Sequence, residues 1–452
     1  MDRRLAAVGL VLVMAAAACS SSDDAGTTVT EAEPGVPTGA SVSDDDSASG
    51  DDRASGDDGA GDEASSDHGS ASVASSESLE AADGAERLSD EGTAGAATSE
   101  DYAPSRQNVG LNAGWVDDNA DFGDYLDFLA TSPVEGVTTV DVSDRQVITV
   151  VDTDGAPIAG AMVELLAGDE VVHRARSHAD GRVFAFPPGD PGDEPSQRQP
   201  VGYSVEVGYG DETVMAELDS AETDHVITLD VERQPVTALD VLFLIDATGS
   251  MSDEINRLKT NMASVADQIS AEQSQVDLRF AMVTYRDHGD EYLTRTTDFT
   301  SDVEGFQVEL DAVVADGGGD NPEAVDEALH EAVEGVSWRS GEAISLVFLV
   351  ADAPPHLDDP QNRFDYADAA LRANESGIKV FPIASSGLDG AGEYVFRQVA
   401  QLTGAPFVFL TYGADGGPGT ERPEFDVDDY SVLALDQLVV RLVSEEIGHQ
   451  TS

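Results

Sequence analysis

The stretch Ala238–Met251, ALDVLFLIDATGSM, decides how the C-terminal half of this chain folds. It begins as an apolar run of strand length, ends that run on a single acid, Asp246, and then turns through Thr248 and Ser250. Such an apolar run is typical of a strand that is buried on both faces of a sheet. We therefore expect one carboxylate and two hydroxyls at the carboxyl end of a buried strand.

Similar apolar runs recur along the chain and alternate with segments that have helical spacing. The runs lie at Leu278–Thr284, Ile344–Ala351, Ile378–Ala384 and Phe407–Thr411. The segments with helical spacing are Met251–Ile269, Val303–Val314, Pro322–Val336, Phe364–Asn374, Tyr394–Leu402 and Val432–Ile447. This alternation predicts an α/β fold, a Rossmann-like, doubly wound and mostly parallel sheet with helices on both faces. Ligands of such sheets bind at the carboxyl ends of the strands.

Oxygen-bearing side chains occur at three places in this region. Asp246, Thr248 and Ser250 follow the first strand, Asp320 ends a glycine-rich loop, and Asp352 follows a later strand. Carboxylate and hydroxyl oxygens, with no His or Cys among them, suit a hard octahedral ion such as Mg²⁺ or Mn²⁺ better than zinc. The sequence therefore predicts a metal site, in which Thr248 and Ser250 bind the ion and Asp246 holds the ion or its water.

These residues resemble the von Willebrand factor type A (VWA) domain and its metal-ion-dependent adhesion site (MIDAS). Asp246, Thr248 and Ser250 match the Asp-x-Ser-x-Ser pattern of that family, with Thr in the place of one Ser, and Asp352 matches its later strand-end acid. Asp320 departs from the pattern, because many members carry a ligand threonine there. The resemblance covers residues 236–452. It implies a non-enzymatic module in which an oxygen of a protein or glycan partner completes the coordination of the metal.

Two local alternatives to the metal site concern helix caps and turns. Ser250 or Ser252 could serve only to cap the following helix. Because proline favours the first helical position, Pro322 makes Asn321 the expected cap of the next helix and leaves Asp320 to face the site. The run Asp287–Asp290 contains His288, and we expect a solvated turn there rather than a second metal cluster, since that His lacks a partner at ligand spacing.

Residues 142–232 are predicted to form a small all-β sandwich, because short alternating strands are broken by Asp-Gly turns. The runs VVDTDGAPIAGAMVELL and SHADGRVFAF resemble carboxypeptidase regulatory-like or transthyretin-like modules, which implies a spacer or binding scaffold. Asp152, Asp154 and Asp180 are expected to be turn residues rather than calcium ligands. Residues 105–141 are predicted to be a short helical connection that packs against the sandwich.

The N-terminal segment has the order of an export signal. Arg3 and Arg4 precede an apolar stretch and small residues that end at Cys19, the single cysteine of the chain. This order resembles a bacterial lipobox, which implies a signal peptide at 1–18, a lipid on Cys19 and a location at the extracytoplasmic side of the cell membrane. Residues 19–104 are rich in Ser, Gly, Ala and acids, so we expect a disordered, acidic linker.

The formal net charge of −66 bears on the class of partner. A strongly acidic surface disfavours nucleic acid and anionic lipid, so membrane contact is expected only through the lipid anchor. Two other functions remain alternatives: a structural envelope protein with a fold-stabilising metal, and a phosphoryl-transfer hydrolase. Against the hydrolase, FLIDATGSM carries Thr248 where a second acid would stand, and no strand-end lysine follows. A nucleotide site at Gly413–Gly419 is disfavoured because Pro418 interrupts it.

Overall fold

The computed structural model describes residues 112–187, 202–272, 276–319, 321–357, 363–411 and 431–451. All of these residues belong to one compact unit, Glu100–Ser452. The predicted signal peptide, Cys19, the linker 19–104, Asp320 and the Gly413–Gly419 run lie outside the described residues.

The centre of the α/β domain is an eight-stranded sheet with the order β11-β10-β9-β12-β13-β14-β1-β15. Its strands are β1 (Asn112–Val116), β9 (Ala238–Asp246), β10 (Asp277–Tyr285), β11 (Thr294–Thr300), β12 (Ile344–Ala351), β13 (Ile378–Ala384), β14 (Phe407–Thr411) and β15 (Ser431–Ala434). The strands β10, β9, β12, β13 and β14 are parallel to one another, whereas β11 and β1 run antiparallel to their neighbours. The predicted fold class is therefore confirmed.

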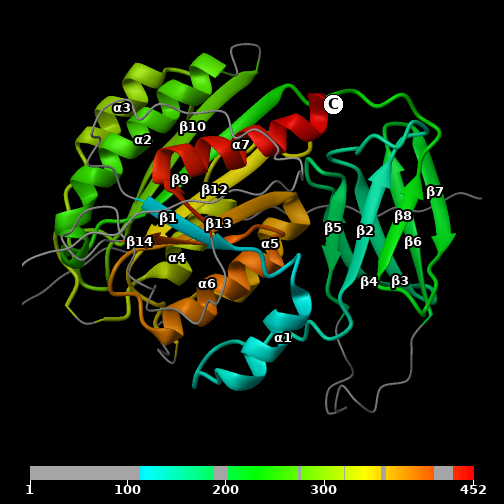
Figure 1. Cartoon of the computed structure of the whole chain (residues 1–452), viewed down its shortest axis with the longest axis horizontal. Helices are drawn as coiled ribbons and strands as arrows, with labels where there is room; N and C mark the ends of the chain where they lie inside the picture. Colours follow the sequence, from blue (N-terminus) through cyan, green and yellow to red (C-terminus); the bar gives the residue numbers. More distant parts are fainter. Residues whose placement is uncertain are drawn as a thin grey trace, which may run out of the picture. The chain divides into compact units, whose positions relative to one another are not determined.

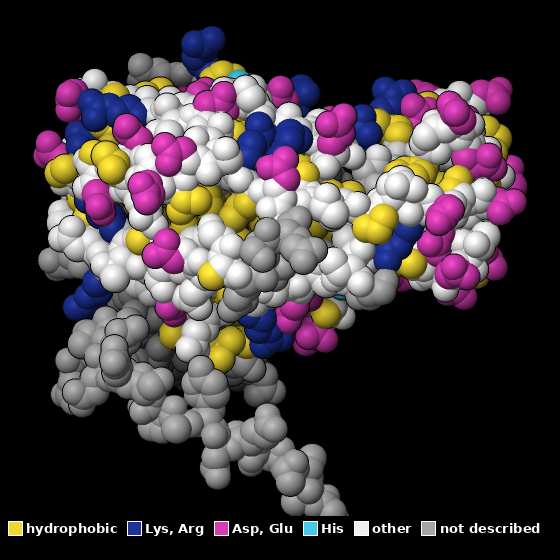
Figure 2. All heavy atoms as spheres, turned by 90° about the horizontal axis from the view of Figure 1, so that it is seen from above, with side chains coloured by type: hydrophobic (Ala, Val, Ile, Leu, Met, Phe, Trp, Pro, Cys, Tyr) yellow, Lys and Arg dark blue, Asp and Glu magenta, His cyan; other side chains and the backbone are white. Residues whose placement is uncertain are grey.

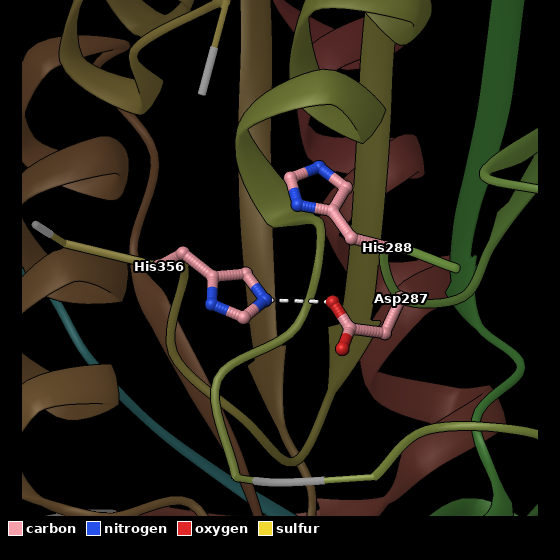
Figure 3. A group of neighbouring side chains, drawn as sticks. All are labelled: Asp287, His288 and His356. Carbon is pink, nitrogen blue, oxygen red and sulfur yellow. Dashed lines mark hydrogen bonds and ion pairs between the residues drawn. The ribbon is translucent and has the colours of Figure 1, made fainter. Parts of the chain in front are cut away.

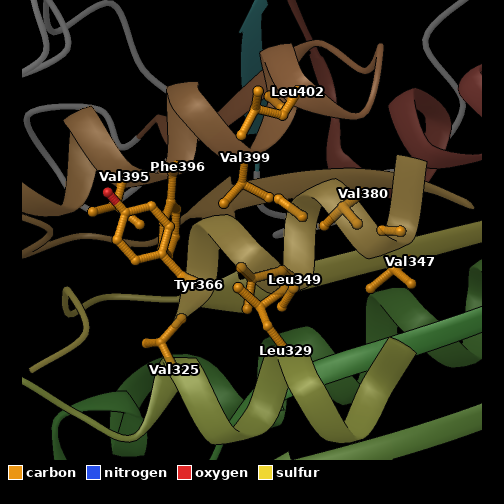
Figure 4. Close-up of a cluster of buried hydrophobic side chains, with 14 of the residues drawn as sticks. Val325, Leu329, Val347, Leu349, Tyr366, Val380, Val395, Phe396, Val399 and Leu402 are labelled. Carbon is orange, nitrogen blue, oxygen red and sulfur yellow. The ribbon is translucent and has the colours of Figure 1, made fainter. Parts of the chain in front are cut away.

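Helices cover both faces of this sheet (Figure 1). One face carries α2 (Ser252–Glu272), α3 (Val303–Asp311) and α7 (Leu435–Thr451), and the other carries α4 (Val325–Glu334), α5 (Tyr366–Ser376) and α6 (Gly390–Leu402). On the second face, apolar side chains of α4, α5 and α6 meet β12 and β13 in a buried cluster (Figure 4). Burial on both faces explains why the sheet strands are apolar throughout.

Three strands of the sheet, β1, β11 and β15, come from residues that the sequence did not predict as strands, and β15 takes the place where the predicted helix Val432–Ile447 begins. β1 lies between β14 and β15, although it precedes the sandwich in the chain. It is followed by α1 (Phe122–Thr131). The prediction that residues 105–141 form only a helical connection to the sandwich is thus wrong in part: β1 completes the sheet, and Phe128 packs on Tyr394 of α6 with ring centroids 6.0 Å apart.

The all-β part consists of two sheets, β5-β2-β8 and β4-β3-β6-β7. Their strands are β2 (Gln146–Val151), β3 (Met162–Ala167), β4 (Glu170–Arg176), β5 (Arg182–Ala185), β6 (Tyr203–Tyr209), β7 (Glu212–Glu217) and β8 (Asp224–Thr228). Inward-facing residues of both sheets share one apolar core. The arrangement is a small sandwich.

A buried ion cluster joins the sandwich to the α/β domain. Lys379 Nζ on β13 lies 3.1 Å from Asp180 Oδ2 and 2.6 Å from Glu446 Oε1 on α7. Asp180 was predicted to be a turn residue. It does accept a backbone hydrogen bond from Arg182, but it also binds the other domain. Asp152 behaves as a turn residue, since its Oδ1 accepts from the backbone of Asp154 and Ala156.

Candidate metal centre

The loop after β9 is held together by the side chain of Asp246. This carboxylate is completely buried, and its Oδ1 accepts hydrogen bonds from Thr248 N at 2.9 Å and Thr248 Oγ1 at 2.6 Å. Its Oδ2 lies 3.4 Å from the hydroxyl of Tyr285, which comes from the neighbouring strand β10. Asp246 is therefore placed rigidly by its own loop and by the adjacent strand.

The chain of hydrogen bonds continues from this loop to the end of β12. Thr248 Oγ1 lies 3.1 Å from Ser250 Oγ, and Ser250 Oγ donates to Asp352 Oδ1 at 3.0 Å. The structure thus brings together Asp246, Thr248, Ser250 and Asp352, as the sequence predicted for them. Thr248 and Asp352 are buried, whereas Ser250 is exposed, so the cluster opens to solvent at Ser250.

The glycine-rich loop around Gly317 and Gly318 lies beside the segment after β9. Gly249 N donates to Gly317 O at 3.0 Å, and Asp316 N donates to Ala247 O at 3.0 Å, so the loop lies directly against the segment after β9. Gly317 and Gly318 have φ values of +81° and +71°, which L-residues with a side chain rarely adopt.

Glu323 is a further acid of the site that the sequence analysis missed. Its backbone forms a bridge to Pro355, and Glu323 N donates to Pro354 O at 2.9 Å, so the residue is extended and lies beside the loop that follows Asp352. Helix α4 begins only at Val325. The predicted cap is therefore wrong: Asn321 precedes the helix by several residues and donates to Asp389 Oδ2 at 3.0 Å instead.

The electrostatics of this cluster favour a bound cation. Burial, followed by the neighbouring Asp352 carboxylate, raises the pKa of Asp246 to about 7. Burial first, and then the neighbouring carboxylates of Asp246, Asp287 and Asp352, together raise the pKa of Glu323 to about 9. Glu323 Oε2 is buried without a hydrogen-bond partner. A divalent cation would satisfy this oxygen and offset the repulsion, so the donor set fits a hard ion.

The run Asp287–Asp290 does form a turn, since Asp290 N donates to Asp287 O at 3.2 Å, but the prediction that it is solvated and that His288 lacks a partner is wrong. Asp287 is buried, and His288 does have a partner: His356, which follows Asp352 in the same loop, stacks on it with ring centroids 5.3 Å apart. Figure 3 shows both imidazoles beside the Asp287 carboxylate. The spacing in the sequence could not reveal this pair, because the two histidines come from the ends of different strands.

Two further features of the described structure concern its surface charge and its helices. Asp and Glu side chains are spread widely over the face in Figure 2, with fewer Lys and Arg between them. Within the described part of the chain, none of the helices combines the length and apolar composition needed to cross a membrane.

Comparison with known families gives one match to a domain. Residues 240–386 match the family model of the von Willebrand factor A domain, which supports a VWA domain in this chain. This stretch contains most of β9, all of β12 and the side chains of the candidate metal centre.

Curated relatives share only part of this chain. An alpha-protein kinase, vwkA, of Dictyostelium discoideum is 28% identical over 144 residues, which are 31% of this chain and 22% of that protein. A putative ariadne-like RING finger protein of Acanthamoeba polyphaga mimivirus is 28% identical over 118 residues, which are 26% of this chain and 11% of that protein. The chain therefore spans less than a quarter of the length of these relatives.

Solved structures give weaker likenesses. Proximal thread matrix protein 1 from the mussel byssus aligns with 39% of this chain and 49% of its own at 16% identity, with a TM-score of 0.27. The pilus adhesin SpaC of Lactobacillus rhamnosus GG aligns with 54% of this chain and 32% of its own at 12% identity, with a TM-score of 0.32.

Proposed function

With a VWA domain at residues 240–386, we propose that this protein is a non-enzymatic binding module whose metal site captures an oxygen ligand of a protein or glycan partner. The observation that carries the proposal is the hydrogen-bonded chain from Asp246 through Thr248 and Ser250 to Asp352. These oxygens, with Glu323, would hold Mg²⁺ or Mn²⁺. Because Ser250 is the exposed member, a partner would approach the ion from that side.

The acids of this site are better suited to holding a cation than to catalysis. A nucleophilic carboxylate needs an open approach, but Asp246 is completely buried and bonded to Thr248 and Tyr285. Partner binding distinguishes this function from that of a purely structural metal. If the ion only stabilises the fold, a variant that loses the ion but stays folded would bind the partner as tightly as the wild type.

The experiment is a pull-down from cell-envelope extract with the full chain in Mg²⁺ or in EDTA. We expect capture of a partner in Mg²⁺, loss of capture in EDTA, and loss with Asp246→Asn and Asp352→Asn. Asp316→Asn is the matched control, because this exposed aspartate removes the same charge close to the site. If the two site variants in Mg²⁺, and the wild type in EDTA, captured as much partner as the wild type does in Mg²⁺, a metal-dependent binding role would be refuted.

We also propose that the protein is a lipid-anchored lipoprotein of the cell membrane that faces the extracytoplasmic side. The proposal rests on the basic, apolar and small-residue order that ends at Cys19. Cys19→Ala should abolish incorporation of labelled palmitate and release the chain from the membrane fraction. Labelled lipid on the variant would contradict it. The sandwich, bonded to the α/β domain through Asp180, would act as a rigid spacer beneath the metal site.

A further inference from the structure

A cluster of two histidines and one aspartate lies next to the predicted magnesium site and has no part in the function proposed above. His288 follows β10 and His356 follows β12, and they meet at the carboxyl edge of the sheet (Figure 3). Candidate ligand atoms of Asp287, His288 and His356 all lie within 4.8 Å of one another. Side chains from two different loops thus lie close enough together for one metal ion to bind all three.

We propose that Asp287, His288 and His356 form a second metal site, which takes a transition-metal ion such as Zn²⁺. Imidazole nitrogens prefer such ions, whereas the oxygen-only cluster around Asp246 prefers Mg²⁺. Two imidazoles and one carboxylate leave a fourth tetrahedral position open for water or a ligand.

The contacts of the cluster suit metal binding. His356 Nε2 and Asp287 Oδ1 lie 2.6 Å apart, whereas two ligands of one zinc ion lie about 3.3 Å apart. The ion would replace the hydrogen bond between these two atoms, with the ring proton on Nδ1, and widen the pair by a fraction of an ångström. Both groups are mostly buried, with 14% of the His356 side chain and 9% of the Asp287 side chain exposed.

Glu327 would orient the second histidine. Its Oε1 lies 3.0 Å from His288 Nε2, and its side chain is buried on the first turn of α4. With the ion bound, Nε2 would donate to this carboxylate, which leaves Nδ1 to bind the ion. A carboxylate in this position is the usual outer partner of a metal-bound histidine.

An ion can reach the cluster from solvent. His356 lines an open cavity of about 520 Å³, together with His330, Arg363 and Asp326. The backbone of Asp287 is also held in place, because Asp287 N donates to Asp290 Oδ2 at 3.1 Å. The site is therefore both accessible and anchored.

The test is calorimetric titration of ZnCl₂ into the full chain, after treatment with EDTA and dialysis, with Mg²⁺ in excess throughout. The excess Mg²⁺ fills the oxygen site and the diffuse sites of the acidic surface. We expect one zinc ion per chain, and affinity at least about tenfold weaker in His288→Ala, His356→Ala and Glu327→Gln. His449→Ala is the control, because it removes an exposed imidazole on α7. Unchanged zinc affinity in both His288→Ala and His356→Ala would overturn the proposal.

A spectrum of the unaltered protein covers the case in which a variant does not fold. Co²⁺ in place of Zn²⁺ should give the intense visible absorption of a tetrahedral site with nitrogen and oxygen ligands, and a weak octahedral spectrum would refute the site. Asp246→Asn separates this proposal from the one above: it should lose Mg²⁺ binding and keep Zn²⁺ binding.

Discussion

Glu323 and Thr248 meet across Gly318. A Cβ atom on Gly318 would lie 2.8 Å from Glu323 Oε1 and 3.2 Å from Thr248 Cβ, and the φ of +71° also favours glycine at this position. The acid comes from the segment before α4 and the hydroxyl from the loop after β9. Their proximity makes Glu323 the carboxylate that completes the candidate metal site on the side of the glycine-rich loop.

Glu323→Gln should weaken Mg²⁺ binding by at least about tenfold, because a neutral amide replaces a carboxylate next to the ion. Calorimetric titration of the full chain measures this. Asp320→Asn tests the acid that the sequence predicted, and Asp316→Asn is the exposed control. If Asp320→Asn abolished the binding and Glu323→Gln left it intact, the assignment of Glu323 would be wrong.

The contribution of Asp246 and Glu323 to the stability of the metal-free protein should fall as pH rises from about 4 to about 9. The folded-state pKa values of Asp246 and Glu323, about 7 and about 9, lie above their ordinary values. The folded state then binds more protons than the unfolded state, so stability is highest below pH 4 with respect to these groups and is lost as pH rises through the raised values. Thermal melts in EDTA across this range measure the loss.

Excess Mg²⁺ should suppress this loss at high pH, because an ion bound only by the folded state stabilises it and favours ionised carboxylates. Asp246→Asn should reduce both the decrease of stability with pH in EDTA and the increase of stability that Mg²⁺ gives. An equal slope in the variant and the wild type would show that other groups cause it.

Lys379→Met should destabilise the protein by about 3–5 kcal/mol, because it leaves the buried carboxylate of Glu446 without its cation and leaves Asp180 paired with Arg182 alone. Denaturant unfolding measures the change. Lys259→Met is a matched control, since Lys259 Nζ makes an exposed contact with the backbone of Asp311 and should cost less than about 1 kcal/mol. Similar losses for the two variants would contradict the importance of the buried cluster.

His178 should make the protein sensitive to acid. Burial lowers the pKa of His178 to about 3, and both of its ring nitrogens are buried without a hydrogen-bond partner. Between pH 6.5 and pH 3 the His178 ring is protonated in the unfolded state but not in the folded state, so the free energy of unfolding decreases as pH falls. At pH 5 the loss amounts to about 2 kcal/mol relative to neutral pH.

The check is the slope of the unfolding free energy between pH 4 and pH 6.5, compared between variant and wild type in EDTA, so that bound metal adds nothing and the metal-site carboxylates contribute equally to both. His178→Leu keeps an apolar group of similar size against Phe184 and should flatten this slope. His449→Ala, which removes an exposed histidine, should leave it unchanged. A slope that persists in His178→Leu would assign the sensitivity to another group.

Local patterns were sufficient to predict the main strands, their helices and the placement of Asp246, Thr248, Ser250 and Asp352. An apolar run such as Ile344–Ala351 is buried on both faces wherever it stands in a parallel sheet, and the residue after it must lie at the carboxyl edge. Pattern and position are properties of neighbouring residues, so the sequence alone determines them.

Contacts between distant segments decided the rest. β1 became part of the sheet only because an edge of β14 was open to it, and Glu323 reached the site because its backbone pairs with Pro355. His288 and His356 meet because β9, between β10 and β12, aligns the ends of both neighbours. Such meetings depend on which strand ends the folded sheet places side by side, and no spacing along the chain contains that information.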